Sequence, residues 1–381
     1  MAQRKLRAVV IGAGWAGEGH TVALQHCGVE VVSICARNEE VVRAVVARLG
    51  VANASTDWRK SLTALKPDIV GLATPAGLRT EVVELAASMG SHILCDKPLA
   101  TTAGDAERLV RIVEQAVVKH AFAATQIYDP SVVWAAELIA NGTIGKLHEV
   151  AAIFRFAGST GLQPWSWSDS LAQGGGALNN GHTHFLGILE RITGGQLAAV
   201  AGERHVVRSR APFVPDIHDG RVRRSMPPLT PEDATGLEWR ECDAEAGFSA
   251  LHRFVPSGSL APEPVRAYIQ LEFRASQPGR ANGWSFHGEN GTLIGEGIFA
   301  LAISRQAGTE LEPLPIPQRL LDALPHVGDD TQSKWVALAR DFVADIQGEP
   351  HDPYLTFRDG WRYQIAIDAI RQGAGWVQMP G

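Results

Sequence analysis

Residues 6–20 read LRAVVIGAGWAGEGH, and this stretch predicts how the first part of the chain folds. The apolar run at residues 8–11 is typical of a buried parallel strand, and a G-x-G-x-x-G turn follows it. The first glycine permits the tight turn, the second lets a pyrophosphate approach the backbone, and the third lets the next helix pack against the strand. Because that helix points free N–H groups at the turn, the stretch predicts dinucleotide binding, with a purely structural glycine turn as the alternative. The predicted cofactor contacts here are Gly12, Gly14, Trp15, Ala16 and Gly17.

Composition sets the broad class of protein. A chain of 381 residues with 45% hydrophobic and 20% charged residues is typical of a soluble globular protein with two domains. A net charge of -6 gives no reason to expect nucleic acid or an anionic membrane as a partner. No apolar run is long enough to span a membrane, and the first strand begins too early to leave room for a signal peptide. The four cysteines lack metal-like spacing, and Cys27, Cys35 and Cys95 lie in apolar elements and are expected to be reduced packing thiols. We therefore expect a cytoplasmic protein, and no metal site.

Short apolar runs alternate with helical patterns up to about residue 126, which predicts a parallel sheet with helices on both faces. The pattern then changes to long alternating strands joined by turns, which predicts a large, mostly antiparallel sheet. We expect helices on one face of this sheet and a second subunit on the other. The fold class is therefore α/β, with a Rossmann domain at residues 1–126 and a substrate-binding and oligomerisation domain at residues 127–381. Residues 209–245 are rich in Pro, Arg and Asp and are expected to form a long loop over a site or an interface.

The residues after the second predicted strand bear on the choice between the two nicotinamide cofactors. An acidic residue here would bind the ribose 2′-hydroxyl of NAD. The chain instead has Ala36, Arg37 and Asn38, and a small residue followed by arginine leaves room and positive charge for a 2′-phosphate. Glu39 and Glu40 are expected in the first turn of the next helix. NADP is therefore favoured over NAD, with a solvated Arg37 as the alternative.

Two further strands end in residues that would face the cofactor, because ligands bind at the carboxyl edge of such sheets. The lysine in Cys95-Asp96-Lys97-Pro98 stands at a strand end, where an ammonium group can bind a substrate hydroxyl and stabilise negative charge on its oxygen. A merely solvated lysine is the alternative. The predicted cofactor contacts in this part of the chain are Thr74, Pro75, Asp96, Lys97 and Gln126.

Together these motifs resemble the Gfo/Idh/MocA oxidoreductases, the family of glucose–fructose oxidoreductase and inositol dehydrogenase. The resemblance rests on GAGWAG, ATPAGLRTEVVELAASMGSHILCDKPLA, IYDPSVVWAAELIANGTIGKLHEV, GGGALNNGHTHFLGILERITG and FHGENGTLIGEG, and covers nearly the whole chain. It implies a Rossmann domain followed by an α/β domain whose open sheet often forms an oligomer interface, here of a homodimer or homotetramer. It also implies a sugar, a polyol or an oxidised derivative as substrate. The family's usual Glu-Lys-Pro is Asp96-Lys97-Pro98 here, which keeps the carboxylate.

The second motif that the resemblance identifies is GGGALNNGHTH at residues 174–184. The family usually has an Asp and a His four residues apart here, and that spacing places both on one face of a helix. In this chain they correspond to Asn180 and His184, while His182 stands at a usual glycine. Histidine suits proton transfer, and an asparagine can orient a sugar hydroxyl but cannot exchange a proton as a carboxylate does. His184 could instead be a satisfied core histidine, and for His182 a structural role is favoured over metal binding.

Four more residues are candidates for the substrate site. Tyr128 stands where the family chain crosses into its second domain beneath the nicotinamide, and Asp129 follows it where the family often has Arg. Trp165 and Trp167 precede the glycine-rich motif and could pack against sugar rings, although a core role is an equal alternative. Arg155 lies on a long strand and either reaches the site or pairs within the sheet.

The resulting hypothesis is an NAD(P)-dependent oxidoreductase that transfers a hydride between nicotinamide and a carbinol or ketone of a cyclic sugar, polyol or sugar derivative. In it, His184 takes or gives the hydroxyl proton, Lys97 stabilises the substrate oxygen and Asn180 fixes a neighbouring hydroxyl. The alternatives are an enzyme that retains its cofactor and cleaves a glycosidic bond without net redox change, and a cofactor-binding regulator.

Overall fold

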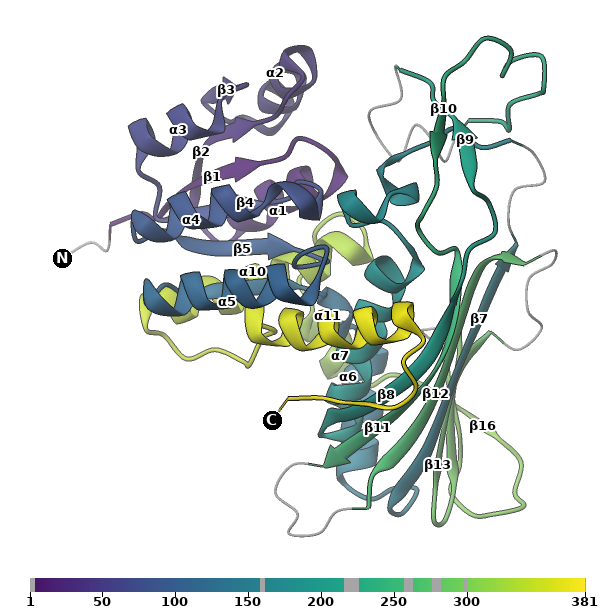
Figure 1. Ribbon diagram of the computed structural model, residues 1–381. Helices are drawn as coiled ribbons and strands as arrows, with labels where there is room; N and C mark the ends of the chain where they lie inside the picture. The colour runs from purple at the N-terminus through teal and green to yellow at the C-terminus, as the bar shows by residue number, and fades with distance from the viewer. Residues whose placement is uncertain are drawn as a thin grey trace.

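Two β-sheets organise the molecule, a parallel sheet near the N-terminus and a large mixed sheet beside it (Figure 1). The structure is a computed structural model that describes residues 4–157, 162–215, 226–256, 263–275, 282–297 and 300–380. Helices lie between the two sheets and on the outer face of the parallel one (Figure 1). This arrangement confirms the predicted fold class.

The parallel sheet has the strand order β3-β2-β1-β4-β5-β6, in which every pair is parallel. Its central strands are short runs of fully buried Val, Ile and Leu, as expected for strands covered on both faces. The strand β3 and the helix α3 were not predicted, because β3 is only three residues long and largely exposed. The elements are β1 (Arg7–Ile11), α1 (Trp15–His26), β2 (Glu30–Cys35), α2 (Glu39–Leu49), β3 (Asn53–Ser55), α3 (Trp58–Leu65), β4 (Ile69–Leu72), α4 (Thr80–Ser88), β5 (His92–Asp96), α5 (Ala103–Gln115) and β6 (His120–Ala123).

The large sheet has the order β16-β15-β14-β13-β7-β12-β11-β8-β17 and is antiparallel except between β7 and β12. Buried residues alternate with exposed or half-buried ones along β7, because one face meets the helices and the other is open. The strands are β7 (Leu147–Ala157), β8 (Gly195–His205), β11 (Gly247–Pro256), β12 (Val265–Ala275), β13 (Gly283–Gly288), β14 (Thr292–Glu296), β15 (Ala300–Ser304), β16 (Glu312–Leu314) and β17 (Val377–Gln378).

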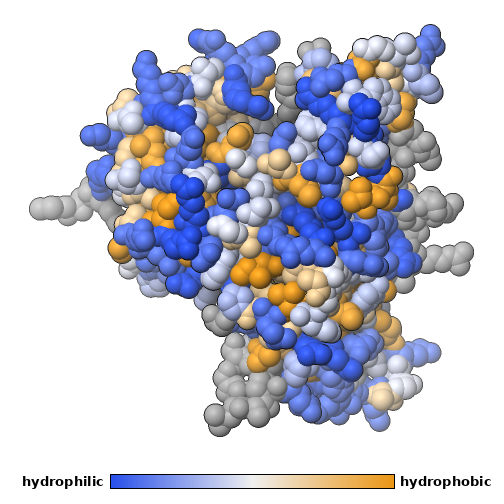
Figure 2. All heavy atoms as spheres, viewed as in Figure 1, coloured by the Kyte–Doolittle hydropathy of each residue, from blue (hydrophilic) through white to orange (hydrophobic). Residues whose placement is uncertain are grey.

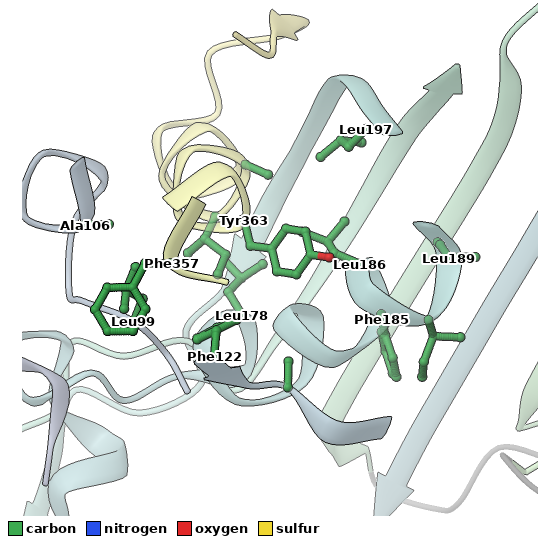
Figure 3. Packing of buried hydrophobic residues seen from close by; sticks show 14 of the residues in the cluster. Leu99, Ala106, Phe122, Leu178, Phe185, Leu186, Leu189, Leu197, Phe357 and Tyr363 are labelled. Carbon is green, nitrogen blue, oxygen red and sulfur yellow. The ribbon is translucent and has the colours of Figure 1, made fainter. Parts of the chain in front are cut away.

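The helices between the sheets join the two halves of the molecule. They are α6 (Pro130–Ala140), α7 (Thr183–Thr193) and α11 (Phe357–Gln372). Figure 3 shows how Phe122 from β6 and Phe357 and Tyr363 from α11 come together with leucines of the second domain. A single hydrophobic core therefore runs from the parallel sheet to the large one, and it holds the two sheet edges in a fixed relation.

The last part of the chain returns to the first sheet. The helix α10 (Asp330–Gln347) packs against α1 and buries Leu338 and Phe342 in the core beneath β1 and β2. The boundary expected at residue 126 falls within the 3-10 turn η2 (Thr125–Tyr128). The chain thus passes from the parallel sheet to the large sheet and then contributes α10 to the parallel sheet again.

Residues 209–245, expected as a long loop, contain a two-stranded ribbon. Its strands are β9 (Arg210–Pro212) and β10 (Trp239–Glu241), which pair antiparallel, while residues 216–225 lie outside the described part of the chain. Among the described residues, no helix has the length and apolar character needed to cross a membrane. The face drawn in Figure 2 accordingly carries small hydrophobic patches between hydrophilic residues.

Candidate active site

The glycine turn after β1 leaves room for a phosphate. Gly12 has a φ of 121°, and a Cβ there would lie 2.7 Å from the carbonyl oxygen of Ala73. A Cβ on Gly17 would lie 1.9 Å from the carbonyl oxygen of Gly12, so this residue is needed for the close approach of α1 to the turn. Gly14, in contrast, has no atom within 4 Å of the position a Cβ would take, and because it has no side chain it leaves the first N–H groups of α1 uncapped. The free N–H groups of α1 beside this open space fit the pyrophosphate of a dinucleotide.

Ala36, Arg37 and Asn38 follow β2 at the carboxyl edge of the parallel sheet. The side chain of Asn38 caps α2 by accepting a hydrogen bond of 3.0 Å from the backbone N–H of Val41, and the two glutamates that follow lie in the first turn, as predicted. Ala36 is half-buried, whereas Arg37 is exposed. Within the described residues Arg37 has no hydrogen bond or ion pair, so its guanidinium is available to a ligand.

Lys97 lies at the carboxyl end of β5 and meets the second domain directly. Its Nζ donates a hydrogen bond of 3.1 Å to Oδ1 of Asn180, and Nδ2 of Asn180 donates one of 2.9 Å to the carbonyl oxygen of Gly176. Burial lowers the pKa of Lys97, and the nearby charge of Arg79 lowers it further, while the Asp96 carboxylate acts in the opposite direction. The ammonium group thus has one side-chain hydrogen-bond acceptor in Asn180 and further donors free for a substrate oxygen.

His184 lies close enough to Lys97 for the two to interact electrostatically. Burial lowers the pKa of His184 to about 3, and the positive charges of Lys97 and Lys334 contribute to this shift. Its Nδ1 is buried and has no hydrogen-bond partner among the described residues. The ring is therefore neutral near pH 7 and can accept a proton, and the structure brings together Lys97, Asn180 and His184.

The π-helical turn η5 (Leu178–His182) precedes α7 and separates two histidines of the same motif. His182 points toward the large sheet, where its Nε2 lies 2.7 Å from Nε2 of His252 on β11. Both rings are buried, and burial lowers the pKa of each, to about 3 for His252. The described residues contain no group of three potential metal ligands. His182 thus packs in the core, away from His184.

A buried ion pair holds the start of η5, and apart from the three glycines no sequence pattern indicated it. The side chain of Glu245 accepts a hydrogen bond of 3.0 Å from the backbone N–H of Leu178 and pairs with Arg371 on α11 at 3.0 Å. A Cβ on Gly176 would lie 2.1 Å from Oε1 of Glu245, so this glycine makes room for the carboxylate. Glu245 is distant in sequence from both partners, which is why no local pattern predicted it.

The sequence patterns also did not identify Lys334 on α10 as part of the site. It is buried, and its Nζ donates hydrogen bonds of 2.9 Å to Oε1 of Gln126 and 2.8 Å to Oδ2 of Asp129. Gln126, a predicted cofactor contact, is therefore held by a cation from the C-terminal helix. A lysine on the apolar face of a predicted helix was the available signal.

The other predicted contacts lie at the same sheet edge. Thr74 and Pro75 follow β4, and the Thr74 hydroxyl is buried without a hydrogen-bond partner among the described residues. Asp96 ends β5, with its Oδ1 3.7 Å from Nε2 of the buried His20. Burial acts to raise the pKa of Asp96, but the neighbouring His20 ring and the positive charges of Lys97 and Arg79 outweigh it, so this pKa is lowered. The unpartnered hydroxyl of Thr74, at the carboxyl edge of the sheet, is consistent with the binding of a polar ligand there.

Two of the candidate substrate residues make contacts away from Lys97. The Arg155 guanidinium donates a hydrogen bond of 2.6 Å to Oε1 of Gln270 on the neighbouring strand, so the arginine pairs within the large sheet. Burial, followed by the Asp341 carboxylate on α10, raises the pKa of the Tyr128 hydroxyl. The Tyr128 hydroxyl has no hydrogen-bond partner among the described residues, and the ring packs against the core of the parallel sheet.

The two tryptophans differ in exposure. Nε1 of Trp165 donates a hydrogen bond of 2.9 Å to the carbonyl oxygen of Glu241, and its ring packs against the β9–β10 ribbon. Trp167 begins the 3-10 turn η3 (Trp167–Asp169) and is 39% exposed. Of the two tryptophans, Trp167 is the more exposed.

Comparison with known proteins gives the family. The family described as "Oxidoreductase family, NAD-binding Rossmann fold" matches residues 6–123, and the "GFO/IDH/MocA C-terminal domain" matches residues 132–294. The chain belongs to the Gfo/Idh/MocA oxidoreductase family.

Several relatives within this family are named sugar dehydrogenases. The chain is similar to levoglucosan dehydrogenase of Pseudarthrobacter phenanthrenivorans, with 29% identity over 50% of this chain and 52% of the relative. It is 26% identical to D-glucoside 3-dehydrogenase of Escherichia coli over 49% of this chain and 53% of the relative. It is 30% identical to D-xylose dehydrogenase of Paenarthrobacter nicotinovorans over 42% of both chains. The similarity thus spans about half the length of these relatives.

Solved structures share the fold over nearly the full length. Levoglucosan dehydrogenase in complex with NADH and L-sorbose superposes with a TM-score of 0.79 at 21% identity, covering 99% of both chains. An oxidoreductase domain protein from Kribbella flavida gives a TM-score of 0.79 at 22% identity, covering 100% of both chains. At this identity the likeness establishes the common fold.

Proposed function

We propose that the protein is an NAD(P)-dependent dehydrogenase or reductase that acts on a carbinol or ketone of a cyclic sugar, polyol or sugar derivative. The observation that carries the proposal is the meeting of Lys97, Asn180 and a neutral His184 at the carboxyl edge of a dinucleotide-binding sheet. The sugar dehydrogenases among the relatives support the same substrate class.

The residues of the site fit the two parts of such a reaction, the transfer of a hydride and the transfer of a proton. The bound cofactor supplies a nicotinamide ring that accepts or donates the hydride. The Lys97 ammonium donates a hydrogen bond to the substrate oxygen and stabilises the negative charge that grows there during oxidation. The neutral His184 ring is the group placed to accept the hydroxyl proton, and burial keeps it in this neutral form near pH 7. Asn180 holds Lys97 through its carbonyl oxygen and orients a neighbouring hydroxyl.

NADP is the favoured cofactor. The exposed guanidinium of Arg37 follows the small Ala36 at the position where a ribose phosphate would lie. Gly12, Gly14 and Gly17 serve either cofactor equally, because the pyrophosphate is common to both.

The open face of the large sheet supports a homodimer or homotetramer. Across this face a row of residues runs over neighbouring strands, and Leu251 in the row is 49% exposed. The row is mainly small or apolar, as at an oligomer interface. It consists of Leu251, Tyr268, Ala151, Ser285 and Ile294. Light scattering after size-exclusion chromatography tests this, and a monomer at micromolar concentration contradicts it.

A cytoplasmic location agrees with the state of the cysteines. All four cysteines are unpaired, as is typical of a reducing compartment. Fractionation of the native host tests the location, and recovery of the protein outside the cytoplasm contradicts it.

A spectrophotometric screen tests the activity. Sugars, inositols and their keto derivatives are offered with NAD, NADP and their reduced forms, and the nicotinamide absorbance is followed. We expect turnover with at least one cyclic sugar or polyol, faster with the phosphorylated cofactor. Cleavage of a glycoside without any net change in absorbance would instead identify an enzyme that recycles a retained cofactor. Absence of any turnover with bound cofactor contradicts the proposal.

A further inference from the structure

Arg79 is a buried arginine behind the active site that the sequence motifs did not single out. It lies between the 3-10 turn η1 (Ala76–Leu78) and α4, and only 2% of its surface is exposed. A buried guanidinium is normally balanced by a carboxylate. Within the described residues Arg79 forms no ion pair, and backbone carbonyl groups receive its hydrogen bonds instead.

The carbonyl groups that Arg79 contacts belong to the two loops that face the cofactor. Its Nε and Nη2 donate hydrogen bonds of 3.0 and 2.6 Å to the carbonyl oxygen of Thr74, after β4. Its Nη1 donates to the carbonyl oxygens of Asp96 and Pro98, after β5. Lys97 is the residue between these last two carbonyls, so the planar guanidinium holds the backbone on both sides of the proposed catalytic lysine.

The same loops form the contact with the glycine-rich segment of the second domain. A Cβ on Gly77 would lie 2.3 Å from the carbonyl oxygen of Ala172. A Cβ on Gly174 would lie 3.4 Å from Cγ of Pro98. Residues 172–174 lead into the turn that carries Asn180, so a shift of the loops that Arg79 holds would change how the two halves of the site meet.

We propose that Arg79 is a positioning residue for the reaction, because its guanidinium fixes the backbone on both sides of Lys97 and so places the ammonium group against Asn180 and the substrate oxygen. The proposal rests on the proposed dehydrogenase function. Arg79 does not touch the reacting atoms, and it acts through Lys97.

The charge of Arg79 has a second effect on the same lysine. It lowers the pKa of Lys97 in addition to the larger effect of burial. The other titratable groups around Lys97 are the Asp96 carboxylate on β5, which raises this pKa, and the neutral His184 on α7. Removing the positive charge of Arg79 therefore makes the Lys97 amine harder to deprotonate.

Two variants separate the geometry from the charge. Arg79→Lys keeps a positive charge but loses the fork that reaches three carbonyls, and Arg79→Met loses both. Arg108→Met is the matched control, because Arg108 lies on the surface of α5 in an exposed ion pair with Glu84. Circular dichroism and NADPH binding establish that each variant is folded.

The first readout is steady-state kinetics with the substrate found in the screen. We expect kcat to fall about a hundredfold in Arg79→Met and about tenfold in Arg79→Lys, because small misplacements of a catalytic group are costly. The KM for the cofactor stays within about twofold, since the glycine turn is untouched. Arg108→Met keeps the kcat of the wild type.

The second readout needs no substrate. Lys97 is acetylated by acetic anhydride across a pH range, and its extent of modification is measured by peptide mass spectrometry. We expect the labelling midpoint of Lys97 to move to higher pH in Arg79→Met and to stay near the wild-type value in Arg79→Lys.

Wild-type kcat in Arg79→Lys overturns the proposal, as does an unmoved labelling midpoint in folded Arg79→Met. If Arg79→Met does not fold, the kcat of Arg79→Lys decides. A wild-type enzyme with no turnover on any sugar refutes the dehydrogenase function instead, and the labelling experiment still tests whether Arg79 controls Lys97.

Discussion

At the carboxyl edge of the parallel sheet, the glycine turn and the loops after β4 and β5 are held by contacts within the first domain, whereas the turn that carries Asn180 is held by buried side chains from distant parts of the chain. The glycine turn depends on Gly12 and Gly17 themselves, and the side chain of Arg79 holds the loops after β4 and β5. The turn η5 depends on Glu245 and Arg371, and its His182 rests on His252. The half of the site in the first domain should therefore tolerate changes outside that domain. The half that carries Asn180 should be sensitive to substitutions at distant positions such as Glu245 and Arg371.

Replacing Lys97 tests the first half with the largest expected effect. In Lys97→Ala the substrate oxygen loses its charged hydrogen-bond donor, so we expect kcat to fall by about a thousandfold. The backbone turns are unchanged, and cofactor affinity and thermal stability should stay near wild type. Steady-state kinetics and fluorescence titration with NADPH measure the two effects. Normal turnover in this variant would refute the assignment of Lys97 as the catalytic lysine.

Replacing Glu245 tests the half of the site that carries Asn180 and His184. Glu245→Gln removes the carboxylate that pairs with Arg371 at 3.0 Å and leaves only Asp368, at 3.9 Å, which should lower the free energy of unfolding by about 3 kcal/mol. Because the same carboxylate holds the start of η5, kcat should fall together with stability. Chemical denaturation and kinetics on the same preparation measure both.

The matched control for Glu245→Gln is Glu312→Gln. Glu312 pairs with Arg305 at 3.8 Å on the surface of the large sheet, and loss of an exposed pair should cost less than about 1 kcal/mol. Equal effects of the two substitutions would show that the buried pair has no special role.

The difference between the two regions also explains which features could be predicted. The parallel sheet, the glycine turn and the position of Lys97 follow from short local patterns, and the structure confirms the sheet and the helices around it. The interactions of Asn180 and Lys97 needed the resemblance to a family, because nothing local brings residues 97 and 180 together. The sequence did not predict the roles of Arg79, Glu245 and Lys334. No local sequence pattern indicates that a charged side chain will be buried against a distant partner.

Acid should weaken the second half of the site. The pKa values of His184 and His252 lie below that of an exposed histidine, and that of His182 is lowered as well. The unfolded chain therefore binds protons first as the pH falls from about 6.5 toward 3, and the folded protein loses stability through this window. Each histidine that stays neutral in the folded protein while the unfolded chain binds a proton adds to this loss.

Melting temperatures between pH 7.5 and pH 5 measure this loss, and His252→Gln should reduce its slope. His26→Gln is the control, because His26 is exposed at the end of α1 and should leave the slope unchanged. A melting temperature that stays constant over this range would show that the three rings are not buried in their neutral form.

The smallest effect on the kinetics is expected from Arg37, where the ribose of the cofactor would bind. Arg37 is exposed, so its contact with a ribose 2′-phosphate is partly screened by solvent. One charge-assisted hydrogen bond of about 1.5 kcal/mol corresponds to roughly a tenfold rise in the KM for NADP in Arg37→Ala, while the KM for NAD should not change. Arg43→Ala is the control, because Arg43 lies on the next helix and pairs with Glu39 at 2.6 Å. An equal rise in KM for NADP and NAD would mean that Arg37 contacts a part of the cofactor that both share. A rise of the same size in Arg43→Ala would mean that the effect comes from the overall positive charge at this edge of the sheet.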